Sequence, residues 1–305
     1  MAQLALKIDV DTFAGTRDGV PALWRVLEQA QVTATFLFSL GPDHTGRAIR
    51  RVFRRGFLSK VRRTSVVSNY GLRTLLYGTL LPGPRIAARC RDVLRETQHR
   101  GHEVGVHVHD HVEWQDRVAT ADEIWTRREF VRACEIFEDV FQIAPRVHGA
   151  AGWQTNVHLL RLEREFGFTH SSDTRGSSPF VPLIGDEGAA GPAVPQWPTT
   201  LPTLDELVGH PQLEGRDPID HLLGLTAGSP LRDHVYTLHA ELEGAAYLDS
   251  FARLLRGWRE QGYSLVTLAQ YAADTDRAQL PIAPIVMGEV PGRSGTLAVR
   301  GVPAS

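Results

Sequence analysis

The sequence predicts an α/β fold built on a parallel sheet, either open or closed into a barrel. Two observations indicate this class. Short runs rich in β-branched and apolar residues alternate with longer segments of helical periodicity. Ionisable side chains also stand at the ends of several strand-like runs, which is where parallel α/β folds gather their sites. The chain has no internal repeat, and its 305 residues with 42% hydrophobic content suffice for one large domain.

The predicted elements follow one another in strand–helix order. Runs of β-branched and apolar residues predict strands over 4–12, 32–41, 102–109, 168–174, 233–241 and 263–271. Apolar residues three to four positions apart predict helices over 19–31, 122–140, 154–167 and 247–261. Residues 276–305 are rich in proline and glycine, so we expect them to form a tail outside a single domain that spans 1–275.

Composition and charge exclude several classes of protein. A net charge of −2 gives no global attraction for nucleic acid. Cys90 and Cys134 lie far apart in no metal-like spacing, which is typical of a reducing cytoplasm. The first residues, MAQLALKIDVD, lack the regions of a signal peptide, and no apolar stretch reaches the ~20 residues that cross a bilayer. We therefore expect a cytoplasmic protein, soluble or peripheral to a membrane.

One insertion, at about 44–84, departs from this pattern. Its first part, 47–63, has no acidic residue and interleaves apolar with basic side chains, among them Arg50, Arg51, Arg54 and Arg55. A solvated helix face and a nucleic-acid contact are alternative interpretations. An amphipathic contact with an anionic membrane surface is favoured, because the positive charge is confined to one segment of a nearly neutral chain.

Three histidines lie within the stretch VGVHVHDHVEW at 104–114. His107 and His111 can face one ion only if the chain turns between them, because on an extended strand they would lie ~13 Å apart. Neutral imidazoles suit Zn, Co, Ni, Mn or Fe, and a carboxylate as third ligand leaves coordination positions open for water. His109, between them, either supports the ligands, faces the substrate or has no role.

Asp9 and Asp11 strengthen the case for a metal site. They stand at positions i and i+2 near the end of the first predicted strand, so their carboxylates point to the same side. Such a pair repels unless a cation or a shared proton relieves it, and one member can bind a metal ion while the other acts as general base. His239, at the end of a late strand, is a candidate general acid. An exposed acidic strand end and a structural histidine are the alternatives.

The order Asp-x-Asp, His-x-x-x-His and Leu-His along the chain resembles the NodB-type polysaccharide deacetylases, metal-dependent amide hydrolases with a distorted (β/α)7 barrel. The stretches IDVDTFAGTRDGVP, FSLGPD, SSDTRG, TLPTLDELVG and VYTLHAELEGAAY are similar, more specifically, to the 4-deoxy-4-formamido-L-arabinose-phosphoundecaprenol deformylases within that family. The similarity extends to about residue 272 and includes the basic insertion.

This resemblance implies a role for each matching residue. Asp11, His107 and His111 would bind one divalent metal ion. Asp9 would be the catalytic base and His239 the catalytic acid. His109 matches no ligand of the family.

The sequence departs from the family pattern at two places. An arginine that holds the catalytic base in the family is replaced by Ala150, with Trp153 as the aromatic residue of that motif and a candidate substrate contact. Arg175 is the candidate replacement for the missing arginine. Gly176 follows it where the family has an Asp-Trp pair that orients the acid histidine, so Asp173 is the candidate for that function.

The resemblance also implies a substrate and partners. The reaction would remove the formyl group from 4-deoxy-4-formamido-L-arabinose linked to undecaprenyl phosphate, giving formate and the 4-amino sugar lipid for lipid A modification and polymyxin resistance. The enzyme would act at the anionic cytoplasmic face of the bacterial inner membrane. The closest alternative is an N-deacetylase acting on another glycan or sugar nucleotide. An oxygenase with two histidines and one carboxylate and a non-catalytic metal-binding protein fit the pattern less well.

Overall fold

The computed structural model describes residues 1–48, 74, 76–184, 193–213 and 215–302. Most of the basic segment 47–63, including Arg50, Arg51, Arg54 and Arg55, lies outside the described residues. Within the described ranges, no helix is both long enough and apolar enough to span a bilayer.

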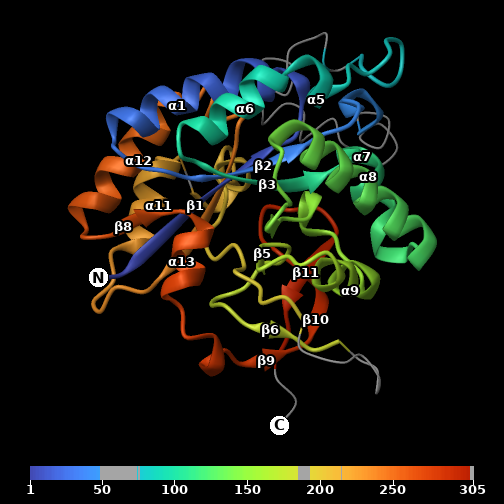
Figure 1. Ribbon diagram of the computed structural model, residues 1–305. Helices are drawn as coiled ribbons and strands as arrows, with labels where there is room; N and C mark the ends of the chain where they lie inside the picture. The colour runs from blue at the N-terminus through green and yellow to red at the C-terminus, as the bar shows by residue number, and fades with distance from the viewer. Residues whose placement is uncertain (49–73, 75, 185–192, 214, 303–305) are drawn as a thin grey trace.

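Seven parallel strands form the central sheet (Figure 1). Their spatial order is β5-β4-β3-β2-β1-β7, and β8 pairs with the first residues of β1. The strand bounds are β1 Gln3–Val10, β2 Thr35–Ser39, β3 Glu103–Val108, β4 Val147–His148, β5 His170–Ser171, β7 His234–His239 and β8 Ser264–Val266. All except β4 overlap the strands that the sequence predicts. β4 has only two residues, too few for a periodicity to indicate it.

An extended segment at 195–200 joins the two edge strands of the curled sheet. On one side, Trp197 donates its backbone N–H to the carbonyl of Ser171 in β5 at 2.7 Å. On the other, Thr200 donates to the carbonyl of Val235 in β7 at 3.0 Å. The segment therefore closes the sheet, and the predicted distorted (β/α)7 barrel is confirmed.

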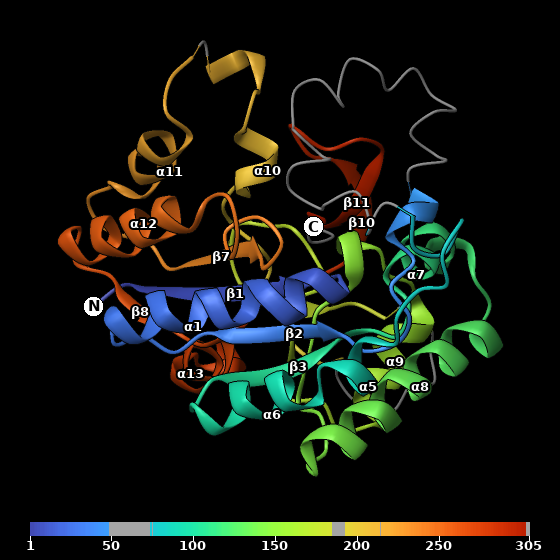
Figure 2. The same ribbon diagram turned by 90° about the horizontal axis from the view of Figure 1, so that it is seen from above.

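Helices surround the barrel, with α1, α6 and α12 side by side along the outside of β1 and β2 (Figures 1 and 2). Asp122 and Asn156 begin α8 and α9 as N-caps, each accepting a backbone N–H three residues on. The longer helices have the bounds α1 Val20–Gln29, α6 Arg91–His99, α7 His111–Arg117, α8 Glu123–Phe141, α9 Val157–Glu165, α11 Pro218–Thr226, α12 Leu248–Glu260 and α13 Leu268–Asp274. Single turns of helix are α5 Ile86–Arg89, α10 Leu204–Leu207, Gly15–Gly19, Val118–Thr120, Ala151–Trp153, Pro211–Leu213 and Arg277–Gln279.

The two faces of β1 differ in polarity, and this difference positions the site. Its outward residues, at even positions, pack beneath the helices in the main hydrophobic cluster. On the inward face, Ala5 joins a smaller cluster that contains Leu37 and Leu268. Lys7 and Asp9 follow on that inward face because strand side chains alternate, and both are buried. The barrel interior is therefore apolar near the start of β1 and charged near its carboxyl end.

Within the described residues, the C-terminal segment contains three strands, and part of it belongs to the buried interior. It forms β9 Ile282–Ala283, β10 Ile285–Glu289 and β11 Thr296–Arg300, and β10 and β11 are an antiparallel hairpin. β9 pairs with β6 Val181–Pro182. Arg175 exchanges backbone hydrogen bonds with Ala298 and Arg300, and Leu297 and Ala298 are buried. The expectation of a tail outside the core is wrong for β11, because alternating apolar residues give this strand a face to bury despite the surrounding glycines and prolines.

Candidate functional site

Asp11, His107 and His111 meet at the carboxyl end of β1 and β3. Asp11 immediately follows β1, His107 is the penultimate residue of β3, and His111 is the first residue of α7. The chain turns between the histidines because β3 ends at Val108 and Asp110 caps α7. Nε2 of His107 and of His111 lie 3.3 and 3.4 Å from the two carboxylate oxygens of Asp11. The structure thus brings together the three predicted metal ligands.

The chemistry of these three side chains fits a divalent metal ion. Their ligand atoms all lie within 4.8 Å of one another. Asp11 Oδ1 and His107 Nε2 are buried and have no hydrogen-bond partner, which is costly unless a ligand satisfies them. Nδ1 of His107 contacts the Gly149 carbonyl, so Nε2 is left as the unprotonated ligand atom. The arrangement provides one carboxylate and two imidazoles, a ligand set that leaves coordination positions of the ion to water or substrate.

The electrostatics of the cluster also favour cation binding. Burial raises the pKa of Asp11, but the neighbouring His111 and His107 outweigh it and hold that pKa well below its ordinary value. Burial lowers the pKa of His111, which keeps its imidazole neutral. An ionised carboxylate and a neutral imidazole are the forms that coordinate metals.

Asp9 lies beside this cluster on the inward face of β1. Its Cα is paired in register with that of His239 on β7, so the two side chains come from adjacent strands at the same level. Asp9 Oδ2 lies 3.3 Å from Nζ of Lys7, whereas Oδ1 is buried without a hydrogen-bond partner. Sequence reasoning missed Lys7; the available signal was a lysine at position i−2 of Asp9 in an otherwise apolar strand.

His239 ends β7, and its imidazole lies among carboxylates. Its Nδ1 is 3.7 Å from Oδ1 of Asp205 in α10. Burial lowers the pKa of His239, but Asp205, Asp11 and Asp9 outweigh it and raise the pKa above its ordinary value. The protonated form is therefore favoured, as a general acid requires. No spacing in the sequence connects Asp205 with His239, although Asp205 lies in one of the family-like stretches.

Arg175 does not contact Asp9, and the prediction that it holds this carboxylate is wrong. Its guanidinium pairs with Glu206 at 2.6 Å and donates to the carbonyl of Leu201 at 3.1 Å. Lys7 is the cation that contacts Asp9. The side chain of Arg175 leaves the barrel wall toward α10, a direction that its place in the sequence does not reveal.

Asp173 is likewise engaged away from His239. Its Oδ1 lies 2.7 Å from Nδ1 of His148 and accepts the N–H of Ala150 at 2.8 Å, and its Oδ2 accepts from Gln196 at 2.7 Å. Glu163 lies 2.9 Å from the same imidazole nitrogen. The contacts of Asp173 thus belong to a buried network in the barrel wall, and it is Asp205 that pairs with the imidazole of His239.

Trp153 is 2% exposed, so its indole is not an open substrate platform. Its Nε1 donates to the hydroxyl of Thr199 at 3.1 Å. Three cations lie over the ring at 4.8–5.3 Å from its centroid, namely Lys7, Arg175 and Arg293. The indole therefore packs among cationic side chains around the site, and its burial disagrees with the predicted substrate contact.

His109 lies outside the ligand cluster. Its Nδ1 is 3.2 Å from Oε2 of Glu129 in α8, so the side chain points toward the helix layer. This direction agrees with its exclusion from the predicted ligands.

Glu241 is a further buried carboxylate that sequence reasoning missed. Its Oε1 accepts the backbone N–H groups of Asp11 at 3.0 Å and of Thr12 at 2.7 Å. Burial, together with the charge of Asp11, raises the pKa of Glu241 to about 8. The contacts fix the turn that carries Asp11. The signal available in the sequence was an acidic residue two positions after His239.

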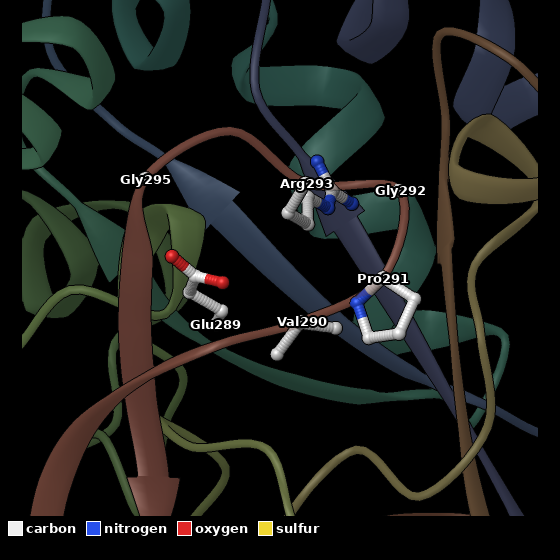
Figure 3. Close-up of a pocket in the computed structure, with 6 residues that line it drawn as sticks. All are labelled: Glu289, Val290, Pro291, Gly292, Arg293 and Gly295. Atoms are coloured by element: carbon white, nitrogen blue, oxygen red, sulfur yellow. The ribbon is translucent and has the colours of Figure 1, made fainter.

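The turn of the β10–β11 hairpin approaches the His239 side of the site. Arg293 in this turn pairs with Asp205 at 3.0 Å and with Glu206 at 2.7 Å. The turn also lines a cavity of about 510 Å³, bounded by Glu289, Val290, Pro291, Gly292, Arg293 and Gly295 (Figure 3). The C-terminal segment thus contributes a side chain to the surroundings of the candidate acid.

Comparisons with known proteins show the family to which this chain belongs. The polysaccharide deacetylase model matches residues 5–171, and the chain belongs to the polysaccharide deacetylase family. Two curated relatives are each named "Probable 4-deoxy-4-formamido-L-arabinose-phosphoundecaprenol deformylase ArnD". The protein of Shewanella sediminis (strain HAW-EB3) is 33% identical over 97% of this chain and 94% of its own length. That of Wigglesworthia glossinidia brevipalpis is 30% identical over 94% of this chain and 98% of its own length.

A solved structure confirms the fold at lower sequence identity. The crystal structure of a "putative polysaccharide deacetylase from Mycobacterium smegmatis" superposes with a TM-score of 0.63 at 17% identity, covering 95% of each chain. Family membership and the curated relatives confirm the prediction of a hydrolase that acts on amides.

Proposed function

We propose that the protein removes the formyl group from 4-deoxy-4-formamido-L-arabinose linked to undecaprenyl phosphate, with one divalent metal ion as cofactor. The observation that carries the proposal is the convergence of Asp11, His107 and His111 with a carboxylate, Asp9, and a histidine, His239, whose pKa nearby carboxylates raise. The names of the two curated relatives support this substrate. The 4-amino sugar lipid so formed would serve lipid A modification and polymyxin resistance.

Each side chain of the site has a separate role in the proposed amide hydrolysis. Asp11, His107 and His111 would hold the ion, which when bound lowers the pKa of a water molecule toward ~7 and polarises the substrate carbonyl. Asp9 accepts the proton of the attacking water at Oδ1, the oxygen that has no protein partner. His239, whose Nδ1 side is occupied by Asp205, donates a proton from Nε2 to the departing nitrogen. The products are formate and the free amine.

A direct assay tests this function. Purified protein is incubated with the formamido-arabinose phospholipid, with and without a chelator, and formate is measured. We expect metal-dependent formate release and much slower release of acetate from the matching N-acetyl lipid. Faster acetate release, or equal activity on a water-soluble N-acetyl glycan, would instead support a general N-deacetylase.

The basic segment 47–63 would bring the protein to the membrane surface, where a lipid-linked substrate lies. Because each arginine near an anionic surface contributes roughly 1 kcal/mol, replacing Arg50, Arg51, Arg54 and Arg55 with glutamate should abolish co-sedimentation with phosphatidylglycerol vesicles. Phosphatidylcholine vesicles are the control for charge, and metal content should not change. Undiminished co-sedimentation of the variant would contradict a membrane contact through these arginines.

A further inference from the structure

Lys7 is a fully buried cation beside the candidate base. Its exposure is 0%, and lysine is almost never buried to this extent unless it is paired. Its ammonium lies 3.3 Å from Oδ2 of Asp9 and donates to the carbonyl of Ser172 at 3.1 Å. It also lies over the ring of Trp153, 5.3 Å from the centroid. The ammonium group therefore has partners on several sides and little freedom to move.

The strand geometry and a glycine create the space for this contact. Lys7 and Asp9 are at positions i and i+2 of β1, so both side chains enter the barrel on one face. Gly149 lies across the interior, where an added Cβ would be 3.1 Å from Cε of Lys7 and only 2.3 Å from a methyl carbon of Leu37. The neighbouring Ala150 is also small. The wall opposite β1 thus leaves room for a long side chain from β1 to reach Asp9.

We propose that Lys7 is the positioning residue for Asp9 in this chain. Its ammonium holds Oδ2, which restrains the carboxylate and leaves Oδ1 as the oxygen able to take a proton from water. This inference rests on the proposed function of Asp9 as the base. It gives to Lys7 the task that the sequence analysis assigned to Arg175, which the structure instead pairs with Glu206.

A purely structural role for Lys7 makes a different prediction. A cation that only stabilises the interior would, when removed, lower stability and metal binding together, and its effect would not depend on Asp9. A positioning residue acts through Asp9 alone, because misplacing a reacting group by about 1 Å can lower the rate about 100-fold. Removal of Lys7 should then have no further effect once Asp9 cannot act as a base.

The experiment compares Lys7→Met, Lys7→Arg, Asp9→Asn and the Lys7→Met/Asp9→Asn double variant. Metal content, kcat and KM are measured for formate release from the formamido-arabinose phospholipid. We expect Lys7→Met to lower kcat about 100-fold with KM within about threefold and metal content unchanged. Lys7→Arg keeps a cation and should recover most of kcat. The double variant should be no slower than Asp9→Asn.

Other outcomes of this experiment would overturn either the role of Lys7 or the proposed role of Asp9. The inference is overturned if Lys7→Met keeps near-normal kcat, if it loses metal in proportion to kcat, or if it slows Asp9→Asn as strongly as it slows the parent enzyme. Should Lys7→Met fail to fold, Lys7→Gln and Lys7→Arg decide: equal activity of the two would refute a need for the cation. Full activity of Asp9→Asn would instead contradict the proposed role of Asp9, whatever Lys7 does.

Discussion

The carboxylates around His239 raise the pKa of its imidazole. Burial lowers its pKa, whereas Asp205, Asp11 and Asp9 raise it, and their sum is a pKa above the ordinary value. Arg293 opposes them but is itself paired with Asp205. The proposed general acid works only while it is protonated, so the upper pH limit of activity should depend on this balance.

Replacing Asp205 with asparagine should therefore move the alkaline limb of the kcat profile to lower pH. The neutral side chain no longer favours the imidazolium, so the pKa of His239 falls and its proton is lost earlier as pH rises. Asp220→Asn, an exposed carboxylate on α11, is the matched control and should leave the profile unchanged. An alkaline limb that stays in place or moves upward would exclude Asp205 as the partner of His239.

The sequence predicts five residues of the site because their chemistry follows local patterns. Asp9 and Asp11 share a strand face, His107 and His111 flank a strand-to-helix turn, and His239 ends a strand. Lys7, Asp205 and Arg293 could not be assigned in this way, since their roles depend on which distant segments meet them. Arg175 and Asp173 were misassigned because adjacency in sequence gives no direction for a side chain that leaves the barrel wall.

At the scale of elements, the β10–β11 hairpin is the part of the C-terminal segment that reaches the site. Its turn places Arg293 between Asp205 and Glu206 and over Trp153. Proline and glycine in this segment predict a loose tail, but the alternation in TLAVR gives β11 one buried face. The pairing of β11 with the backbone of Arg175 is a long-range contact that local composition does not indicate.

Arg293→Met should lower kcat/KM at least about tenfold. This loss corresponds to ~1.4 kcal/mol, an energy near the lower end of the range for one hydrogen bond to a charged group. Arg293→Lys should recover part of the loss. Arg300 in the same hairpin contacts Ser178 and Phe180 instead. The Arg300→Met variant should therefore retain normal activity. Equal losses for Arg293→Met and Arg300→Met would show that the hairpin acts only through stability.

At the scale of the whole molecule, the network of His148, Glu163 and Asp173 makes stability depend on pH. Burial lowers the pKa of His148, but Asp173 and Glu163 raise it to about 9, above the ordinary 6.5. Burial, followed by the charge of Asp173, raises the pKa of Glu163 to about 8, above the ordinary 4.5. Between pH 6.5 and about 9 for His148, and between pH 4.5 and about 8 for Glu163, the folded state binds more protons than the unfolded state. The free energy of unfolding therefore falls as pH rises through these ranges.

Glu163→Gln should flatten this pH dependence, because the amide is neutral throughout. The contribution of His148 is fully present below pH 6.5 and is lost as pH rises through about 9, so part of the alkaline decline should remain. Urea unfolding between pH 5 and 9 measures the difference between the two proteins. An equally steep decline in the variant would mean that Glu163 is already ionised in the folded protein.

Two aspartates that lie two residues apart, Asp9 and Asp11, have different proposed roles. In the proposed mechanism Asp11 holds the metal ion and Asp9 accepts the proton from water, so isosteric replacement should separate metal binding from turnover. The decisive measurement is metal content together with formate release for Asp9→Asn and Asp11→Asn. Asp9→Asn should retain the metal and lose activity about 100-fold or more, whereas Asp11→Asn should lose both. Substantial activity in Asp9→Asn, or a full complement of metal in Asp11→Asn, would contradict the account.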